Sequence, residues 1–329
     1  MPQTPLPTRP LGTSGLDLTT VGFGAWAVGG GTWAFGWGPQ DDDESIDAMR
    51  RALALGVNWI DTAAVYGLGH SEELVGRVLR DLPESERPYV FTKGGLVWNE
   101  RDRMAAPVQT LAPGSIRLEV EASLRRLGVE RIDLYQFHRP DAETPIVESL
   151  QALDDLVKQG KVRYIGQCNF AGWQIADAQW TARTEHLTRL ISAQHEYSLT
   201  NRDIQTEVLP AARAMGTGIL PYYPLGGGFL TGKYRRGVMP QGARLTKANA
   251  RTANRFVNER NFDLLERFEA FASERGHSMT ELAFAWLLSQ PEVGSVIAGA
   301  TLPEQVDENV AAGQWRLSAE EMDALAAIG

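Results

Sequence analysis

The 329-residue sequence contains one cysteine, Cys168, and only five histidines. A single cysteine excludes an internal disulfide and any zinc site built from thiolates. The histidines at positions 70, 138, 186, 195 and 277 form no HxH or HExxH pair. We therefore expect no bound metal, and the scarcity of cysteine favours a reducing compartment.

Long apolar runs are also missing. No stretch approaches the roughly 18 consecutive apolar residues that a membrane span needs. The first residues, MPQTPLPTRPLG, are polar and proline-rich and lack the apolar core of a signal peptide. The 32 lysines and arginines are outnumbered by 41 acidic residues, which gives a formal net charge of -9. These features predict a cytoplasmic protein that binds neither nucleic acid nor a membrane.

Eight β-type runs rich in branched and aromatic residues alternate with helical patterns along the chain. The runs begin at Thr20, Val57, Tyr89, Ile132, Val162, Leu190, Thr217 and Val293. Glycines at positions 56, 128, 160, 216 and 276 follow the helical patterns and are typical of helix ends. The alternation predicts an α/β fold, a (β/α)8 TIM barrel that forms a single domain over residues 1–329.

Two further segments complete this predicted fold. Residues 11–18 have the pattern of an N-terminal β-hairpin, with Ser14 and Gly15 at its centre. We expect this hairpin to close the bottom of the barrel. Residues 226–260, which follow the seventh strand, form the longest segment that we expect to be irregular, and such loops are usually functional.

Polar side chains end three neighbouring strands of the predicted barrel. Asp61 and Tyr66 follow the second strand, Lys93 ends the third and His138 ends the fourth. Catalytic residues of TIM barrels lie at these C-terminal strand ends. Taken singly, each of the four has an ordinary structural interpretation, as a turn, packing, solvated or hydrogen-bonded residue. Together, at successive strand ends, they favour a catalytic site.

The chemistry of this set is that of a proton donor. A lysine ammonium about 4 Å from a phenol, at an effective dielectric constant near 20, favours the phenolate by roughly 4 kcal/mol. We expect Lys93 to lower the pKa of Tyr66 towards neutral pH, with Asp61 as the counter-charge of Lys93. His138 would orient a carbonyl group. Without a nucleophile or a metal, the set fits reduction of a carbonyl by a hydride cofactor.

Three other features carry weaker signals. The segment GLGHSE resembles a dinucleotide-binding GxGxxG loop, but Glu72 replaces its third glycine. Gln194 and His195 are adjacent on one strand, so alternation allows only one of them to face the site easily. Cys168 ends a strand, where a redox role competes with that of a small buried residue.

Five motifs occur in order on these strands: DTAAVYGLGHSEELVG, TKGG, DLYQFHRP, IGQCNF and YYPLGGGFLTGKY. Together they resemble the aldo-keto reductase superfamily over nearly the whole chain. The resemblance implies a catalytic tetrad of Asp61, Tyr66, Lys93 and His138, with Tyr66 as the proton donor. It also implies an NADP(H)- or NAD(H)-dependent enzyme that reversibly reduces an aldehyde or ketone to an alcohol.

The resemblance further implies where the cofactor binds. Asn169 and Gln194 would hold the nicotinamide carboxamide, and Tyr222 would stack on its ring. The whole implied set is Gly24, Ala25, Trp26, Asp61, Cys168, Asn169, Gln194, Tyr222, Tyr223, Pro224, Leu225, Gly227, Gly228, Lys233, Arg244, Gly299, Gln305, Glu308 and Asn309. Cys168 and Tyr223 depart from the family, which commonly has serine at the first position and often at the second.

The sequence gives opposing signals on the cofactor. Selection of NADPH needs positive charge near the 2′-phosphate. Residues 299–309 contain no lysine or arginine and three acidic residues, which favours NADH or no preference. Lys233 and Arg244, after the seventh strand, are the alternative source of charge. We expect both cofactors to bind, with NADP(H) favoured.

The substrate contacts are expected on loops at the same end of the barrel. The aromatic residues Trp26, Trp33, Trp37 and Trp98 suggest an aromatic wall, while Asn99, Arg103 and Arg139 suggest a small, polar, sugar- or polyol-related substrate. The substrate contacts that we predict are Trp26, Tyr66, Trp98, His138 and Arg139.

A second interpretation remains open. Potassium-channel β-subunits share this barrel and resemble the chain in the GKY segment, which would make the protein a non-catalytic nicotinamide-binding subunit. The complete tetrad favours the enzyme. The expected partner is then a small carbonyl or alcohol substrate, and the expected assembly is a monomer or a small homo-oligomer.

Overall fold

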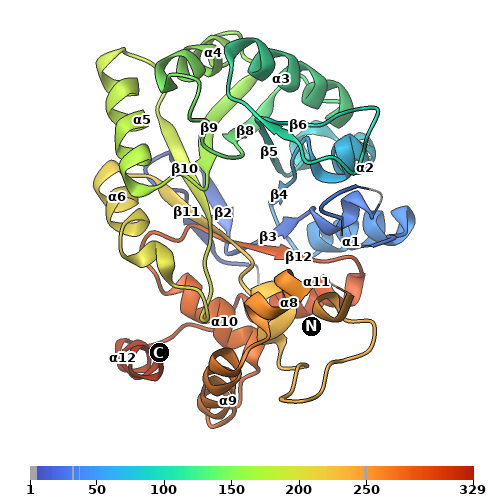
Figure 1. The fold of residues 1–329 in the computed structure, drawn as a ribbon, viewed down its shortest axis with the longest axis vertical. Coiled ribbons are helices and arrows are strands. Elements are labelled where there is room, and N and C mark those ends of the chain that lie inside the picture. Colours follow the sequence, from blue (N-terminus) through green and yellow to red (C-terminus); the bar gives the residue numbers. More distant parts are fainter. Residues whose placement is uncertain (1–5, 32, 37, 248–249) are drawn as a thin grey trace.

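The computed structural model describes residues 6–31, 33–36, 38–247 and 250–329. Eight parallel strands form its central sheet, in the order β11-β10-β9-β8-β5-β4-β3-β12 (Figure 1). They are β3 (Val21–Gly24), β4 (Trp59–Asp61), β5 (Tyr89–Gly94), β8 (Ile132–Phe137), β9 (Val162–Cys168), β10 (Leu190–Glu196), β11 (Gly218–Tyr222) and β12 (Val296–Gly299). A parallel bridge between Ile219 and Val293 joins the two ends of the sheet. The predicted (β/α)8 barrel is confirmed, and every strand lies within its predicted run.

Helices surround this barrel (Figure 1). They include α1 (Asp42–Ala54), α2 (His70–Arg80), α3 (Pro113–Leu127), α4 (Ile146–Lys158), α5 (Gly172–Thr184), α6 (Val208–Met215), α9 (Glu259–Ser273), α10 (Met279–Leu288), α11 (Pro303–Ala312) and α12 (Ala319–Ile328). Their apolar faces are buried, as at Ile116 and Val120 of α3. Gly128 and Gly216 cap α3 and α6 with φ angles of 66° and 70°, a conformation in which glycine ends a helix without strain.

The N-terminal hairpin closes one end of the barrel. Its strands, β1 (Thr8–Pro10) and β2 (Asp17–Thr19), pair antiparallel, and the Leu11 amide donates to the Leu16 carbonyl across the turn at 2.9 Å. Leu11, Leu16 and Leu18 are buried in one cluster with side chains of the barrel strands, Trp59, Phe91, Leu134 and Leu220. The predicted hairpin is therefore present, and its leucines leave only the opposite end of the barrel open.

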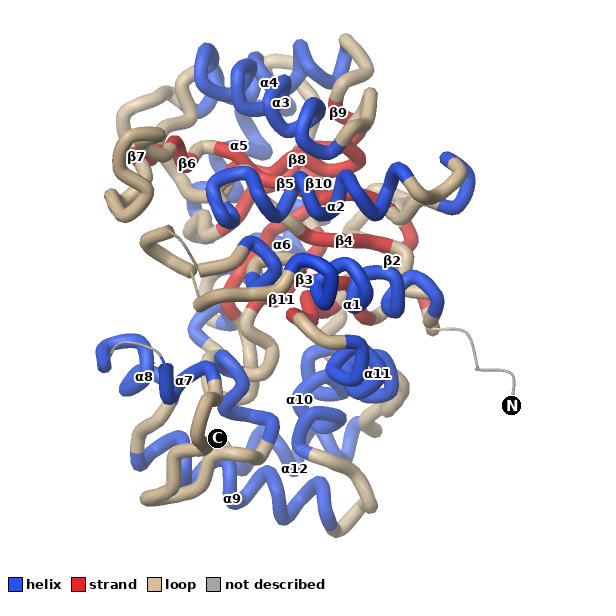
Figure 2. The backbone as a smooth tube through the Cα atoms, turned by 90° about the vertical axis from the view of Figure 1, so that its right-hand side faces the viewer, coloured by secondary structure: helices blue, strands red, loops and turns tan. Residues whose placement is uncertain are grey.

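The segment after β11 is more regular than the sequence indicates. In place of one irregular stretch over residues 226–260, it contains η5 (Gly226–Thr231), α7 (Arg244–Lys247), α8 (Ala250–Phe256) and the start of α9. Burial explains the difference, because Phe229, Leu245 and Phe256 join the main hydrophobic core. In Figure 2, α7 and α8 lie near α9 and away from α3 and α4.

Smaller elements lie in the connections between the strands and the helices. They are η1 (Ala27–Gly29), η2 (Tyr66–Gly69), η3 (Glu84–Glu86), η4 (Asp203–Gln205) and an unexpected antiparallel ribbon of β6 (Leu96–Val97) and β7 (Val108–Gln109). Within the described ranges, no helix combines the length and the apolar character that a membrane crossing requires.

Candidate active site

The four predicted tetrad residues meet at the open end of the barrel. Asp61 ends β4, Tyr66 begins η2, Lys93 lies in β5 and His138 directly follows β8. The Lys93 side chain is fully buried, and its Nζ donates to Asp61 Oδ2 and to the Thr62 carbonyl, both at 2.7 Å. Lys93 Nζ also donates to Tyr66 Oη at 3.3 Å. The phenol, the ammonium and the carboxylate thus form one connected chain.

His138 completes the set from the neighbouring strand. Its ring lies edge-on to that of Tyr66, with a centroid separation of 5.7 Å and an interplanar angle of 77°. Burial, followed by the charges of Lys93 and Arg139, holds the pKa of His138 well below its usual value. Its buried Nδ1 has no hydrogen-bond partner among the described residues. His138 is therefore neutral at physiological pH and can offer a hydrogen bond to a ligand.

The acidity of Tyr66 differs from our expectation. Burial raises the pKa of Tyr66 to about 12, and the charge of Lys93, which lowers it, does not compensate. The reason is the 2.7 Å contact between Lys93 and Asp61, since the carboxylate offsets much of the ammonium charge and itself raises the pKa of the phenol. Although burial opposes its charge, Lys93 also has a raised pKa because Asp61 and Tyr66 stabilise the ammonium. Tyr66 is thus fully protonated at neutral pH.

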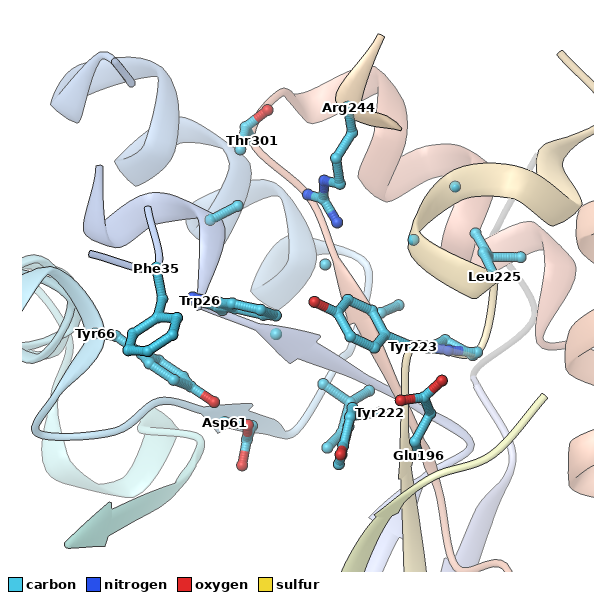
Figure 3. Close-up of a pocket in the computed structure, with 18 of the residues that line it drawn as sticks. Trp26, Phe35, Asp61, Tyr66, Glu196, Tyr222, Tyr223, Leu225, Arg244 and Thr301 are labelled. Atoms are coloured by element: carbon cyan, nitrogen blue, oxygen red, sulfur yellow. The ribbon is translucent and has the colours of Figure 1, made fainter. Parts of the chain in front are cut away.

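A cavity of about 940 Å³ opens above the tetrad (Figure 3). Its size lies at the upper end of the range for small-molecule and cofactor pockets. All but one of the predicted cofactor contacts line it: Gly24, Trp26, Asp61, Cys168, Asn169, Gln194, Tyr222, Tyr223, Pro224, Leu225, Gly227, Gly228, Lys233, Arg244, Gly299, Gln305, Glu308 and Asn309. Ala25 is fully buried and does not line the cavity.

The predicted substrate residues are only partly brought together. Trp26, Tyr66, His138 and Arg139 line the cavity, as does Trp33. Trp98 does not, because its Nε1 donates to Glu100 and its ring packs against Arg126 beside the unexpected β6–β7 ribbon. Asn99 and Arg103 are exposed outside the cavity. Trp37 lies outside the described residues.

Three polar side chains of the cavity, those of Gln194, Asn169 and Tyr222, are linked to the tetrad by hydrogen bonds and form what we call the cavity floor. Gln194 Nε2 donates to Asp61 Oδ1 at 2.9 Å, Asn169 Nδ2 donates to the His138 carbonyl at 3.2 Å, and the Tyr222 hydroxyl donates to Asn169 Oδ1 at 2.8 Å. A primary amide has two donors and two acceptor positions, so Gln194 and Asn169 retain capacity for a ligand. His195 does not line the cavity, as strand alternation allows, and burial lowers its pKa to about 4.

Backbone strain marks the same floor. Asn169 and Tyr223 have φ angles of 62° and 54°, in the left-handed region that residues with side chains rarely adopt. Both follow a strand of the barrel and both line the cavity. Such conformations concentrate at binding and catalytic sites, where the surrounding structure holds them. Burial raises the pKa values of the Cys168 thiol and of the Tyr222 hydroxyl, so both stay protonated.

The rest of the cavity fits a long anionic ligand such as a dinucleotide. Gly227 and Gly228 bring bare backbone to its wall with φ angles of 66° and 97°, and a Cβ on Gly228 would approach Lys233 Nζ to 3.7 Å. Burial and the charge of Arg244 lower the pKa of Lys233, while Glu308 opposes this shift, so the three charges share one region. Amides, glycine backbone and cations together suit a nicotinamide, a pyrophosphate and an adenosine end.

Two charged residues of the cavity, Glu196 and Arg255, escaped the sequence analysis. Glu196 ends β10, and one oxygen of its carboxylate accepts from Asn201 at 3.0 Å while the other pairs with Arg255 of α8. Glu196 lies two residues after Gln194, so strand alternation carried a signal for it. Arg255 belongs to the segment that we expected to be irregular, where no periodicity could single it out.

Comparisons with known proteins agree with this geometry. The model of the aldo/keto reductase family matches residues 21–329. The chain is 38% identical over 318 residues to an NADH-specific methylglyoxal reductase of Escherichia coli K12, covering 94% of each protein. It is 34% identical to a probable voltage-gated potassium channel subunit beta of Oryza sativa subsp. japonica, covering 92% of this chain and 89% of that protein.

Two solved structures are similar along almost the whole chain. A glycerol dehydrogenase from Gluconobacter oxydans matches with a TM-score of 0.84 and 36% identity, covering 98% of this chain and 94% of the other. The holo form of an aldo-keto reductase from Bacillus halodurans matches with a TM-score of 0.80 and 26% identity, covering 98% and 96%.

Proposed function

The chain belongs to the aldo/keto reductase family, and we propose that it is an NAD(P)(H)-dependent enzyme that reversibly reduces a small, polar aldehyde or ketone. The observation that carries the proposal is the buried chain of hydrogen bonds from Asp61 through Lys93 to Tyr66. It holds a protonated phenol beside the neutral ring of His138, in the wall of a cavity large enough for a cofactor.

Each tetrad residue has a distinct role in this proposal. The cofactor, when bound, supplies the hydride, with its nicotinamide held by Asn169, Gln194 and Tyr222. Tyr66 Oη holds the proton that goes to the carbonyl oxygen, and the hydrogen bond from Lys93 stabilises the phenolate that remains. Because a developing alkoxide is a stronger base than a phenolate, a pKa of about 12 still allows Tyr66 to act as the acid.

His138 and Asp61 support this transfer. Neutral His138 donates a hydrogen bond to the carbonyl oxygen and fixes its position beside Tyr66 Oη. Asp61 keeps Lys93 charged in a buried position and in line with the phenol. In alcohol oxidation the same groups run in reverse, with the Tyr66 phenolate as the base.

The character of the cavity supports a small polar substrate. The polar side chains of Arg139 and Gln109 line it, together with the aromatic side chains of Trp26, Trp33 and Phe35. Two similar proteins are named as a methylglyoxal reductase and a glycerol dehydrogenase, and both names refer to small oxygen-rich compounds. Sugar- or polyol-related aldehydes and ketones therefore remain the proposed class.

For the cofactor, we propose that both forms bind and that NADP(H) is favoured. Lys233 and Arg244 bring two positive charges to the cavity, against the one negative charge of Glu308. A charge-assisted contact to the 2′-phosphate strengthens binding by roughly 1.5–3 kcal/mol. NAD(H) has support of its own, because the Escherichia coli relative is named as NADH-specific.

A substrate panel tests the function directly. We expect turnover of carbonyl compounds or polyols, followed by reduced-nicotinamide absorption near about 340 nm. Tyr66→Phe should lower kcat by about 10²-fold or more with little change in cofactor Kd. The matched control is Tyr197→Phe, which removes a buried hydroxyl that accepts from Gln205 outside the cavity. Near-normal turnover in a folded Tyr66→Phe protein would contradict the assignment.

Similarity to a protein named as a probable voltage-gated potassium channel subunit beta supports a second candidate function, that of a non-catalytic subunit. A non-catalytic nicotinamide-binding subunit would bind the cofactor tightly and turn over no member of the panel. That outcome would favour the second candidate, whereas Tyr66-dependent turnover of any member would favour the enzyme.

A further inference from the structure

Several of the charged groups that line the cavity are held in ion pairs. Asp61 pairs with Lys93, and Glu196 pairs with Arg255. Arg139 lines the same cavity, yet within the described part of the chain it forms neither an ion pair nor a side-chain hydrogen bond. A guanidinium has five donors in a fixed planar fork, and it is always charged. An arginine left without a partner beside a catalytic site is available to a ligand.

The position of Arg139 is set by the barrel. It directly follows His138 at the end of β8, so the strand that places the catalytic ring also places the arginine. Its charge lowers the pKa values of His138, Cys168 and Tyr222, which come from three different strand ends. The positive charge therefore acts on the cavity floor, where a carbonyl must lie to reach Tyr66.

Apolar and aromatic residues line the cavity as well. Trp26, Trp33 and Phe35 present aromatic surface to the cavity, and Leu96 and Pro107 extend it. Apolar surface near a charge lowers the local dielectric constant, which strengthens a charge-assisted hydrogen bond. The site thus combines an apolar surface, a proton donor and the guanidinium of Arg139.

We propose that Arg139 binds an anionic group on the substrate, so that carbonyl compounds carrying a carboxylate or a phosphate are preferred over neutral ones of similar size. The inference rests on the proposed function and narrows its substrate class. Carboxylate and phosphate both match the bidentate geometry of a guanidinium. A single well-placed contact of this kind gives a preference of about tenfold or more.

Two matched pairs of substrates test the proposal. Glyceraldehyde is compared with glyceraldehyde 3-phosphate, and butanal with succinic semialdehyde, so that the phosphate and the carboxylate are assessed separately. In the natural protein, we expect kcat/KM for the anionic member of at least one pair to exceed that of the neutral member by about tenfold. The pair with the larger ratio identifies the preferred anion.

Variants then assign the preference to Arg139. Arg139→Met removes the charge at similar length and should reduce the anionic-to-neutral ratio to near unity, mainly through KM. Arg139→Lys should restore part of the ratio, because it keeps the charge but loses the fork. The matched control, Arg101→Met, changes an exposed arginine outside the cavity and should leave the ratio unchanged.

The possible outcomes distinguish failure of the role proposed for Arg139 from failure of the proposed reductase function. Efficient turnover of both members of each pair with equal kcat/KM would overturn the role of Arg139 and leave the proposed function intact. A preference that survives in Arg139→Met would overturn it as well. So would a loss in Arg139→Met that is equal for both members and accompanied by weaker cofactor binding, because Arg139 would then serve the cofactor. Absence of turnover for every substrate would overturn both proposals.

Discussion

The two ends of the cavity hold their charges in different ways. Beside Tyr66, the Asp61–Lys93 pair is carried by adjacent strands and is almost completely buried. On the segment after β11, Lys233 lies in a turn, Arg244 and Arg255 lie on the short helices α7 and α8, and the Arg255 side chain is 51% exposed in its pair with Glu196. The proposed chemistry thus lies on the sheet, and the cations proposed to bind the cofactor phosphate lie on turns and short helices.

Buried and exposed ion pairs differ in how much folding free energy is lost when they are broken. Removing one partner of a buried ion pair leaves an uncompensated charge and costs about 3–5 kcal/mol. An exposed pair contributes about 0.2–1 kcal/mol, because water screens both charges. Substitutions at the buried tetrad pair should therefore cost more stability than substitutions of the exposed arginines on the segment after β11.

The largest effect that this contrast predicts is on folding. Lys93→Met should lower the free energy of unfolding by about 3–5 kcal/mol, because Asp61 stays buried without its partner. Urea denaturation measures the change. The control is Arg117→Met, which breaks an exposed pair with Asp155 and should cost less than about 1 kcal/mol. Similar losses in the two variants would remove the contrast between buried and exposed charges.

The next effect concerns the cofactor. Replacing Lys233 and Arg244 together with alanine should weaken NADPH binding about tenfold or more and leave NADH binding almost unchanged. Titration of protein fluorescence with each cofactor gives the two Kd values. Arg236→Ala is a control from the same segment, because Arg236 is paired with Asp263. Equal losses for NADPH and NADH would show that the two cations hold the pyrophosphate or the segment itself.

The same contrast explains what could be predicted from the sequence. Asp61, Lys93 and His138 are fixed by strand ends, and strand ends are visible in local alternation, so the barrel was predicted correctly and the structure brings these three residues together as expected. Tyr66 follows in a short turn and was found by the same logic. The direction of the pKa shift of Tyr66 was not predicted, because the sequence shows neither how deeply the phenol is buried nor how closely Asp61 offsets the charge of Lys93.

Long-range packing accounts for the remaining errors. The Glu196–Arg255 pair joins residues 59 positions apart, and α8 forms because Phe256 reaches the core. Trp98 was assigned to the substrate site, but the ribbon of β6 and β7 holds it beside Glu100 and Arg126 instead. The positive φ angle of Tyr223 has no sequence signal, because tyrosine is neither a glycine nor one of the polar residues, such as asparagine, that adopt this conformation more readily.

A smaller effect tests the link between the two regions. Arg255 on α8 pairs with Glu196 on β10 across the edge of the cavity. Arg255→Met should increase the dissociation rate of the cofactor by no more than about fivefold, because the Arg255 side chain is half exposed and water screens its charge. Stopped-flow displacement measures this rate. Glu196→Gln should have the same effect if the pair acts as a unit, and a change beyond tenfold in either variant would indicate direct contact with the cofactor.

The smallest expected effect is that of pH on carbonyl reduction. Tyr66 must be protonated to act as the acid, and its pKa of about 12 keeps it protonated until strongly alkaline pH. His138 must be neutral, and its lowered pKa means that neutrality is lost only as the pH falls well below the usual value for histidine. The kcat for reduction should therefore change less than about twofold between about pH 6.5 and about pH 9.

Alcohol oxidation should instead accelerate with pH in this window, since its base is the Tyr66 phenolate, whose fraction rises about tenfold per pH unit below the pKa. Steady-state rates in both directions test this asymmetry, and a reduction profile that falls near neutral pH would mean that Lys93 outweighs burial after all.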